Sequence, residues 1–304
     1  MLLETLAKRA KMQEDIFLRI AGAASRSYKQ YPILKHDGTE RIIYQPSRAL
    51  KSIQRMLVRS VISKAPIHEA ATAYKKGASI KRNAELHRET AFTIRVDFSD
   101  FFPSFKRQDV RKFLESINQV QSMGFDQRDI KFILDVCLRY DETAIGAPSS
   151  PAITNAMMFP FDKAMSDFCL NNELIYTRYA DDMFISSNEK DKLNDIEKLI
   201  EDCVKIDGIP NLSINKNKTI HLSRKGHRSI TGLVITTDYK ISMGRSRKRY
   251  IRSLVHLYFD KTLAPEKRGE LEGLLAFAHD VEPTFLDSLN LKFGTDVRSI
   301  FRKV

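Results

Sequence analysis

Hydrophobic positions along the chain follow two different periods, and each period predicts a different kind of element. Residues 50–64, 107–120 and 127–140 repeat apolar side chains every three to four positions, which is typical of amphipathic helices packed on a core. Residues 91–98 and 174–187 are nearly continuous apolar stretches with the length of a buried strand and of a hairpin. We therefore expect a protein that mixes helices and strands along its length.

The same pattern extends toward both ends of the chain. Residues 1–30 are amphipathic and predicted to be helical, and residues 31–47 are predicted to form a hairpin that turns at Asp37-Gly38. The stiff turn Gly146–Pro151 opens a long helix, 152–171, which Pro160 should kink. The remaining expected elements are a helix at 190–206, strands around 212–214, 219–223, 229–236 and 239–243, and helices at 246–260, 265–279 and 284–293. This order is typical of an α+β fold with a helical unit at its end.

Three aspartates interrupt the apolar strand regions. Asp97 lies in the first of them, and Asp181 and Asp182 lie at or near the tip of the expected hairpin 174–187. Carboxylates that are buried close together are unfavourable unless something offsets their charge, and a divalent metal ion commonly does so. If the two strand regions meet, these residues would form a two-metal site for phosphoryl transfer. The alternative is a pair of ordinary turn aspartates and a salt-bridged Asp97.

The net charge of the chain indicates which kind of partner it binds. The 304 residues carry 50 Lys and Arg against 38 Asp and Glu, a net charge of +12, which favours a polyanion such as nucleic acid. Five cations gather at the start of a predicted helix: Arg245, Arg247, Lys248, Arg249 and Arg252. Cations are unfavourable at a helix N-terminus, and docked phosphates would offset that cost. A solvated charge run is the alternative for this cluster, and a basic surface kept for solubility is the alternative for the whole chain.

Cysteine content and hydropathy indicate the compartment. The three cysteines are odd in number and their spacing fits neither a disulfide framework nor a zinc motif, so we expect a reducing cytosol. The N-terminus has no charged region followed by an apolar run, as a secretory signal would. No stretch of about 18 apolar residues occurs either. We expect a cytoplasmic protein with no membrane partner.

Four ordered motifs resemble the palm of reverse transcriptases. Phe92–Ser104 is similar to the first metal motif of that family, and Tyr179–Asp182 is similar to the second. Gly146–Pro151, together with Asn155, resembles the motif that positions template and nucleotide, and Leu212–Thr219 resembles the lysine motif after the catalytic hairpin. The resemblance covers about residues 35 to 295.

The resemblance implies a set of metal ligands. Asp97, Asp181 and Asp182 would hold two Mg²⁺ ions, with the backbone carbonyl of Phe98 as a further ligand. These three aspartates would be the catalytic residues of nucleotidyl transfer.

The resemblance also implies nucleotide-binding residues. Phe102 falls where the family places the ring that rejects a 2′-hydroxyl, and core packing is the alternative for it. Lys218 would approach the leaving pyrophosphate, or else be a solvated lysine. Arg41 would grip the triphosphate, or else form a surface salt bridge, and Ala147 belongs to the nucleotide-positioning motif.

Two further elements resemble the retron branch of the family. Asn83–His87 matches the Asn-Ala-x-x-His element of retron enzymes, although His87 alone would be interpreted as a buried structural histidine. Ile230-Thr231-Gly232 stands where retron enzymes have Val-Thr-Gly. We expect Asn83, His87, Thr231 and Gly232 to bind RNA, together with the basic cluster. Ile145 departs from the Gln of many relatives, which puts a side-chain contact to the nucleotide from this position in doubt.

The implied fold is a right-hand polymerase, α+β, with a palm built on an antiparallel sheet. Its expected domains are N-terminal helices and fingers at 1–90, a palm at 91–240 and a helical thumb at 241–304. The residues after the palm suffice for a thumb but not for a nuclease domain, so template removal would need a host RNase H.

The implied activity is RNA-directed DNA synthesis from deoxynucleotides. A retron enzyme would bind its cognate non-coding RNA, prime from the 2′-hydroxyl of an internal guanosine and release a branched RNA with short single-stranded DNA. Such enzymes act in anti-phage defence with an effector protein. The alternatives are another stand-alone bacterial reverse transcriptase, of the diversity-generating or abortive-infection type, and an inactive RNA-binding scaffold.

Overall fold

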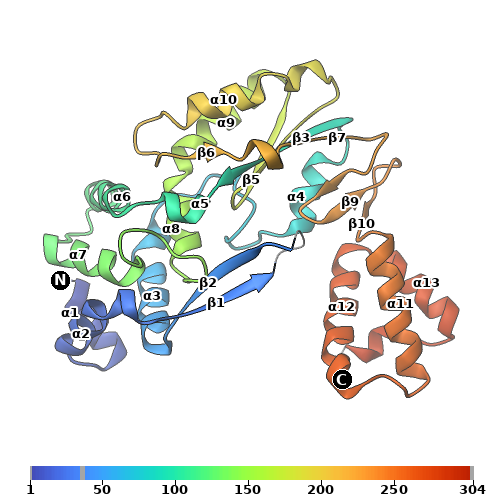
Figure 1. The fold of residues 1–304 in the computed structure, drawn as a ribbon, viewed down its shortest axis with the longest axis horizontal. Coiled ribbons are helices and arrows are strands. Elements are labelled where there is room, and N and C mark those ends of the chain that lie inside the picture. The colour runs from blue at the N-terminus through green and yellow to red at the C-terminus, as the bar shows by residue number, and fades with distance from the viewer. Residues whose placement is uncertain (1, 35–37, 302–304) are drawn as a thin grey trace. The chain divides into compact units, whose positions relative to one another are not determined.

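The computed structural model describes residues 2–34 and 38–301 and combines helices with antiparallel sheets, which confirms the expected α+β class (Figure 1). The chain forms two compact units. The first comprises Met1–Gly77, Ile94–Ile185 and Asp191–Ile220, and the second comprises Ala78–Thr93, Ser186–Lys190 and His221–Val304. Each unit is described by itself.

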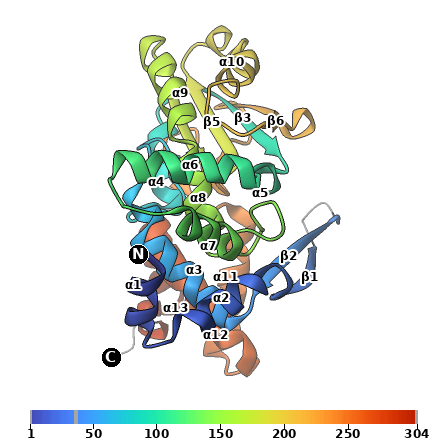
Figure 2. The ribbon, with the colours of Figure 1, turned by 90° about the vertical axis from the view of Figure 1, so that its left-hand side faces the viewer.

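Helices of the first unit gather around α7, Gln127–Cys137 (Figure 2). The apolar side chains of α7 are buried, including those of Ile130, Ile133 and Leu134. The helices in contact with α7 are α1 (Leu2–Ala10), α2 (Glu14–Gly22), α3 (Arg48–Ser60) and α6 (Arg107–Val120). This cluster confirms the helical spacing of residues 50–64 and 107–120.

The expected N-terminal hairpin is confirmed. Its strands β1, Tyr28–Leu34, and β2, Glu40–Pro46, pair antiparallel, while the predicted turn residue Asp37 lies outside the described residues. The backbone of β2 is joined to the 146–151 turn, because Tyr44 N donates to Ile145 O at 2.8 Å. Gly146 has φ +105°, and a Cβ there would lie 2.9 Å from Tyr44 O. Only glycine fits this close approach.

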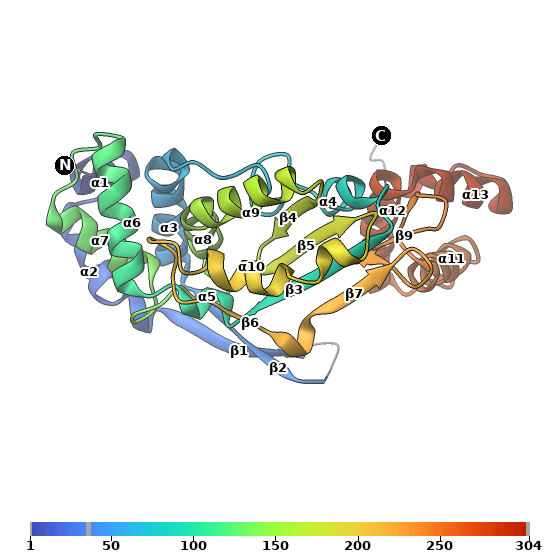
Figure 3. The ribbon, with the colours of Figure 1, turned by 90° about the horizontal axis from the view of Figure 1, so that it is seen from above.

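The largest sheet has the strand order β4-β5-β3-β6, and β7 also pairs with β3 (Figure 3). Helices α9 and α10 contact it through β4 and β6. The strands are β3 (Phe92–Ser99), β4 (Ile175–Tyr179), β5 (Asp182–Ser187), β6 (Ser213–Ile214) and β7 (Ile220–Ser223). The two apolar stretches of the sequence are therefore the buried strands of this sheet, as predicted.

The long helix after the 146–151 turn is broken, as Pro160 predicts. It forms α8, Ser150–Met157, and α9, Phe159–Asn171, with Met158 between them at φ −77° and ψ 1°. Proline lacks the amide hydrogen that a continuous helix needs at this point. After the break, α9 packs against β4 of the sheet.

Three expected elements differ from the structure. The helix predicted at 127–140 ends at Cys137, and that predicted at 190–206 consists of a 3-10 turn and α10, Ile196–Cys203. The prediction of a single strand at 229–236 is wrong. This segment is a hairpin of β8, Ser229–Ile230, and β9, Leu233–Ile235, because Thr231 and Gly232 both adopt positive φ, as a two-residue type I′ turn requires.

The second unit combines a small sheet with helices. Its sheet has the order β10-β9-β8, with β10 at Ile241–Ser242, and α4, Ile80–His87, packs on it. The three expected C-terminal helices are confirmed as α11 (Arg245–Phe259), α12 (Arg268–Val281) and α13 (Pro283–Phe293). They share an apolar core that includes Val255, Leu271 and Leu286. Among the described residues, no helix combines the length and apolar character that crossing a membrane requires.

Candidate active site

The three aspartates come from adjacent strands. Asp97 lies near the end of β3, and Asp181 and Asp182 occupy the turn and first position of the β4–β5 hairpin. Ala180 opens that turn at φ +59°, and Phe98 N lies 3.4 Å from Asp181 O. Strand order therefore brings the first and second metal motifs together, although they are about 85 positions apart in sequence.

The surroundings of Asp181 and Asp182 make their charged forms less favourable. Burial raises the pKa of Asp181, and the charge of Asp97 raises it further. Burial and then the charge of Asp181 raise the pKa of Asp182 to about 6. Two cations partly offset this repulsion: Lys218 Nζ lies 3.0 Å from Asp97 Oδ1, and Arg95 Nε lies 3.9 Å from Asp182 Oδ1. The site therefore still favours additional positive charge.

The donor set fits a divalent cation. Among the described residues, no three His, Cys, Asp or Glu side chains are already arranged to hold a metal ion. The three aspartates nevertheless offer the hard oxygen donors that Mg²⁺ prefers. Burial and then carboxylate charge raise the pKa of Asp181 and Asp182, and a bound cation would favour the charged form that both effects oppose.

A cavity of about 480 Å³ opens beside the aspartates. Its walls include Asp181, Phe98, Arg41 from β2, Phe102 and Lys218. These are five of the residues expected to hold metal or nucleotide, and they come from four separate segments of the chain. The volume suits a small ligand such as a nucleotide.

Ala147 has a different setting from those residues. It is only 2% exposed, whereas Ile145, two positions earlier, lines the cavity. Asn155 of the same motif is also buried and donates from Nδ2 to Ala73 O at 2.8 Å.

Phe102 is held firmly at the cavity wall. It belongs to the short helix α5, Phe101–Ser104, and its ring meets that of Phe101 edge to face at 5.4 Å. Thr143 Oγ1 donates to Phe102 O at 2.6 Å. The ring is half-buried, so one part packs against protein while another borders the cavity.

Sequence reasoning missed three residues at or behind the site. Tyr74 lines the cavity, and burial, Tyr179 and Asp181 raise its pKa. Arg95 is two positions before Asp97 and so lies on the same strand face, a signal that could have identified it. Arg178 is fully buried in an otherwise apolar strand, which is itself an unusual placement for arginine.

Asn83, Ala84 and His87 of the Asn83–His87 element are buried in the second unit, while Glu85 and Leu86 are exposed. Asn83 and His87 are both 0% exposed, and His87 Nδ1 lies 2.7 Å from Ser186 Oγ. Burial and then the charge of Arg228 lower the pKa of His87 to about 3, so the ring is neutral at physiological pH. Thr231 Oγ1 donates to Ile80 O at 3.1 Å, which joins the β8–β9 turn to α4. Of the four residues expected to bind RNA outside the basic cluster, Gly232 is exposed, Thr231 is half-buried, and Asn83 and His87 are buried.

The basic cluster lies at the start of α11, as predicted. Arg245, Arg249 and Arg252 are exposed. Lys248 is ion-paired with Glu282, and the guanidinium of Arg247 lies over the Phe277 ring at 5.1 Å. The cluster therefore divides into exposed cations and cations that stabilise the helical unit.

Comparisons with known proteins agree on one family. The model of the reverse transcriptase (RNA-dependent DNA polymerase) family matches residues 33–241. Retron Ec83 reverse transcriptase of Escherichia coli is 33% identical over 98% of this chain and 96% of its own length, and retron Ec73 reverse transcriptase of the same species is 35% identical over 90% and 89%. Telomerase from Candida albicans aligns at TM-score 0.48 and 12% identity, over 94% of this chain and 59% of that chain, a likeness too distant to carry an argument. The chain therefore belongs to the reverse transcriptase family, as a retron-type RNA-directed DNA polymerase.

Proposed function

We propose that this polymerase acts by two-Mg²⁺ nucleotidyl transfer in the cavity beside Asp97, and that its template is the structured non-coding RNA of a retron. One observation carries the first part. Asp97 lies on the strand next to the turn that carries Asp181 and Asp182, and burial together with neighbouring carboxylates raises the pKa of Asp181 and of Asp182. Asp181 also lines a cavity that contains Arg41 and Lys218.

The proposed roles follow from the positions of the side chains. Asp97, Asp181 and Asp182, with the carbonyl of Phe98, would hold two Mg²⁺ ions, which supply activation of the attacking hydroxyl and neutralise charge on the leaving oxygen. Lys218 stays close to Asp97 and offers its ammonium to the pyrophosphate side. Arg41 reaches the same cavity from β2 and can bind triphosphate oxygens. Ala147 supports the turn that leads to the cavity wall at Ile145.

Phe102 is proposed to select deoxynucleotides by occupying the space of a 2′-hydroxyl. Replacing it with Ala should open that space, so the preference for dNTP over rNTP, measured as a ratio of kcat/KM, should fall at least tenfold. Phe102→Tyr keeps the ring and serves as the matched control with an unchanged preference. An Ala variant that discriminates as well as the wild type would mean that the ring only packs.

The proposed product is a branched RNA–DNA molecule primed from the 2′-hydroxyl of an internal guanosine. The support is the similarity to retron reverse transcriptases over nearly the whole chain. Asn83, His87, Thr231, Gly232 and the cations of α11 are the proposed RNA-binding residues. Template removal would fall to a host RNase H. The proposed context is anti-phage defence together with an effector protein, in a cytosol that suits three free, buried cysteines.

Nucleic acid that copurifies with the protein tests this proposal. After RNase digestion, a retron product leaves a short DNA joined to an RNA stub, and a 2′–5′ debranching enzyme shortens it. Unbranched DNA alone would indicate another stand-alone bacterial reverse transcriptase. RNA alone, from a protein that also fails to extend a primer, would indicate an RNA-binding scaffold.

A further inference from the structure

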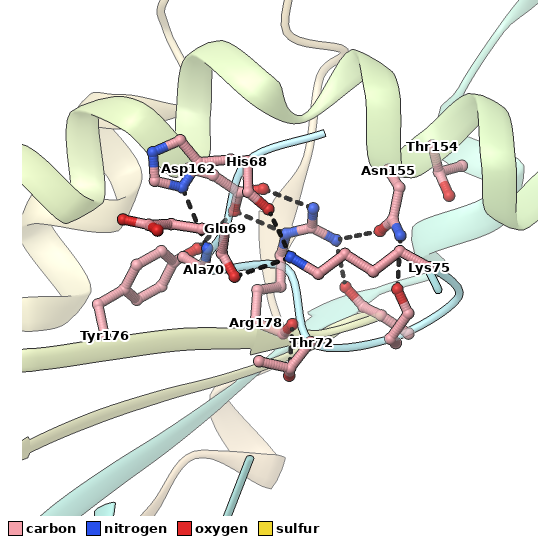
Figure 4. A network of polar contacts seen from close by, with 12 residues as sticks. His68, Glu69, Ala70, Thr72, Lys75, Thr154, Asn155, Asp162, Tyr176 and Arg178 are labelled. Carbon is pink, nitrogen blue, oxygen red and sulfur yellow. Dashed lines mark hydrogen bonds and ion pairs between the residues drawn. The ribbon is translucent and has the colours of Figure 1, made fainter. Parts of the chain in front are cut away.

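A buried arginine lies directly behind the aspartate turn. Arg178 is 0% exposed and stands on β4, three positions before Asp181 (Figure 4). A guanidinium in a protein core needs partners for its charge and for its N–H groups, and the first unit supplies both.

The charge of Arg178 is matched by Asp162 of α9. Arg178 Nε and Nη2 donate to the two oxygens of Asp162 at 2.8 and 2.6 Å, and Tyr176 Oη donates to Asp162 Oδ1 at 2.8 Å. Asp162 is also 0% exposed. This two-point pairing fixes the plane of the guanidinium relative to the strand.

The remaining donor group of Arg178 reaches the catalytic turn. Nη1 donates to Ala180 O at 2.9 Å and to Asn155 Oδ1 at 3.1 Å. Ala180 has φ +59°, a left-handed conformation that a non-glycine residue adopts only when its surroundings hold it there. The hydrogen bond from Arg178 to the Ala180 carbonyl helps to keep Ala180 in this conformation, and Ala180 directly precedes Asp181.

The same residue anchors the loop that carries Tyr74. Arg178 N donates to Ala70 O at 2.8 Å, and Thr72 N donates to Arg178 O at 2.7 Å, so the loop pairs with the edge of β4. Asn155, held by Arg178, donates to Ala73 O at 2.8 Å. Tyr74 follows at once and lines the cavity. The side chain of Arg178 is thus connected to the aspartate turn and, through Asn155, to the loop that brings Tyr74 to the cavity wall.

Stability alone does not account for this arrangement. A buried ion pair can usually be replaced by well-packed apolar side chains with little loss of stability, because removing both charges also removes their desolvation cost. What an apolar pair cannot do is hold the Ala180 carbonyl and the Asn155 amide in fixed positions.

We infer that Arg178 is a positioning residue for nucleotide addition. It fixes the turn that presents Asp181 and Asp182, and through Asn155 it fixes the loop that places Tyr74 in the cavity wall. The inference rests on the proposed function, because it takes these two aspartates to be the metal-binding carboxylates.

The central variant is the apolar pair Arg178→Met with Asp162→Leu. We expect a thermal midpoint close to that of the wild type. We expect the kcat for adding one deoxynucleotide to fall tenfold or more, the Mg²⁺ concentration for half-maximal rate to rise several-fold, and KM for the nucleotide to change less. Hydrogen exchange of the amides at 180–183, measured without metal, should accelerate while amides of α10 stay unchanged.

The matched control is another ion pair of the same unit, Arg107→Met with Asp135→Leu. This pair joins α6 to α7, away from the turn, and its replacement should leave the Mg²⁺ dependence and the exchange at 180–183 unchanged. If the central variant does not fold, Arg178→Lys and Asn155→Ala replace it. Lysine keeps the charge beside Asp162 but cannot form all four hydrogen bonds. Asn155→Ala removes the hydrogen bonds that join Arg178 to Ala73 through Asn155 and leaves the one from Arg178 to Ala180.

Two outcomes separate the inference from the proposed function. Wild-type kcat, Mg²⁺ dependence and hydrogen exchange in the apolar pair, or in both replacement variants, would overturn the positioning role. A wild-type protein that adds no nucleotide, or an Asp181→Asn variant that adds it normally, would overturn the proposed function instead.

Discussion

Among the residues that the structure describes, each unit buries one arginine, and the charges of these two arginines have opposite surroundings. Arg178 is 0% exposed and Arg228 is 1% exposed. Burial would lower the pKa of Arg178, but the charge and hydrogen bonds of Asp162 more than reverse that and leave it raised. For Arg228, burial and then the charge of Arg224 lower the pKa to about 10.

The partners explain this difference. Within the described residues, the hydrogen bonds of Arg228 go to neutral oxygens, those of His87 O, Thr90 O and Thr90 Oγ1. Arg178 pairs its charge with Asp162 through Nε and Nη2, which leaves Nη1 to donate to the Ala180 carbonyl in the turn. Arg228, whose partners in the described part of the chain are neutral oxygens, adds its positive charge to the burial that keeps His87 neutral. In one unit the buried arginine is held in an ion pair, and in the other its charge adds to the effect of burial that keeps a neighbouring histidine neutral.

The largest stability effect is expected for Arg178→Met alone. The change leaves the carboxylate of Asp162 buried without its counter-charge, so the free energy of unfolding should fall by about 3–5 kcal/mol. Urea unfolding followed by circular dichroism measures this, and adding Asp162→Leu should restore most of the loss. A single variant as stable as the wild type would show that Asp162 finds another partner.

Arg228→Met should cost less, about 1–3 kcal/mol, because it leaves neutral carbonyls unpaired rather than a charge. It should also raise the pKa of His87, since the repelling cation is gone, and NMR titration of the His87 ring measures that shift. If Arg228→Met destabilises the protein more than Arg178→Met does, the contrast between the two arginines fails.

His87 predicts a pH dependence with a definite sign. Its folded pKa of about 3 lies below its ordinary value of 6.5, so the unfolded chain takes up this proton first as the pH falls. Stability from His87 is complete above pH 6.5 and is lost between 6.5 and 3, which amounts to about 2 kcal/mol by pH 5. His87→Gln removes this contribution, and the difference between the two unfolding curves isolates it. If the stabilities of the wild type and His87→Gln fall equally with pH, a group other than His87 takes up the proton.

The smallest stability effect is expected on the exposed face of α11. Arg249→Glu should change the free energy of unfolding by less than about 0.5 kcal/mol. It should nevertheless weaken RNA binding and reduce the slope of log affinity against log salt by about one. Lys198→Glu, an exposed charge reversal on α10, is the matched control. Equal effects of both variants would mean that overall charge, and not α11, attracts the RNA.

Local rules predicted most of the fold. Proline chemistry is a property of one residue, so the break before Pro160 could be expected. The apolar stretches predicted the central strands, and the four motifs predicted the family before any comparison. The β8–β9 hairpin could not be found in this way, because Thr231 is β-branched and rarely adopts the positive φ that it has here.

The residues behind the site were harder to predict. Arg178 and Asp162 are 16 positions apart on a strand and a helix, and nothing local indicates that they pair. Tyr74 lies in a segment interpreted only as polar and basic, and it reaches the cavity because its loop pairs with β4. Helix α7 ends at Cys137 because Arg139 and Glu142 pair their backbones instead, a contact that its helical spacing does not reveal.

The central claim is that Asp97, Asp181 and Asp182 together carry out nucleotide addition. The most direct measurement is the incorporation of one deoxynucleotide into a primer on an RNA template, with Mg²⁺, by the wild type and by Asp181→Asn with Asp182→Asn. We expect the variant to keep its fold and to add the nucleotide about a thousandfold more slowly or worse, which corresponds to several kcal/mol of lost transition-state stabilisation. A variant that adds the nucleotide at the wild-type rate would contradict it.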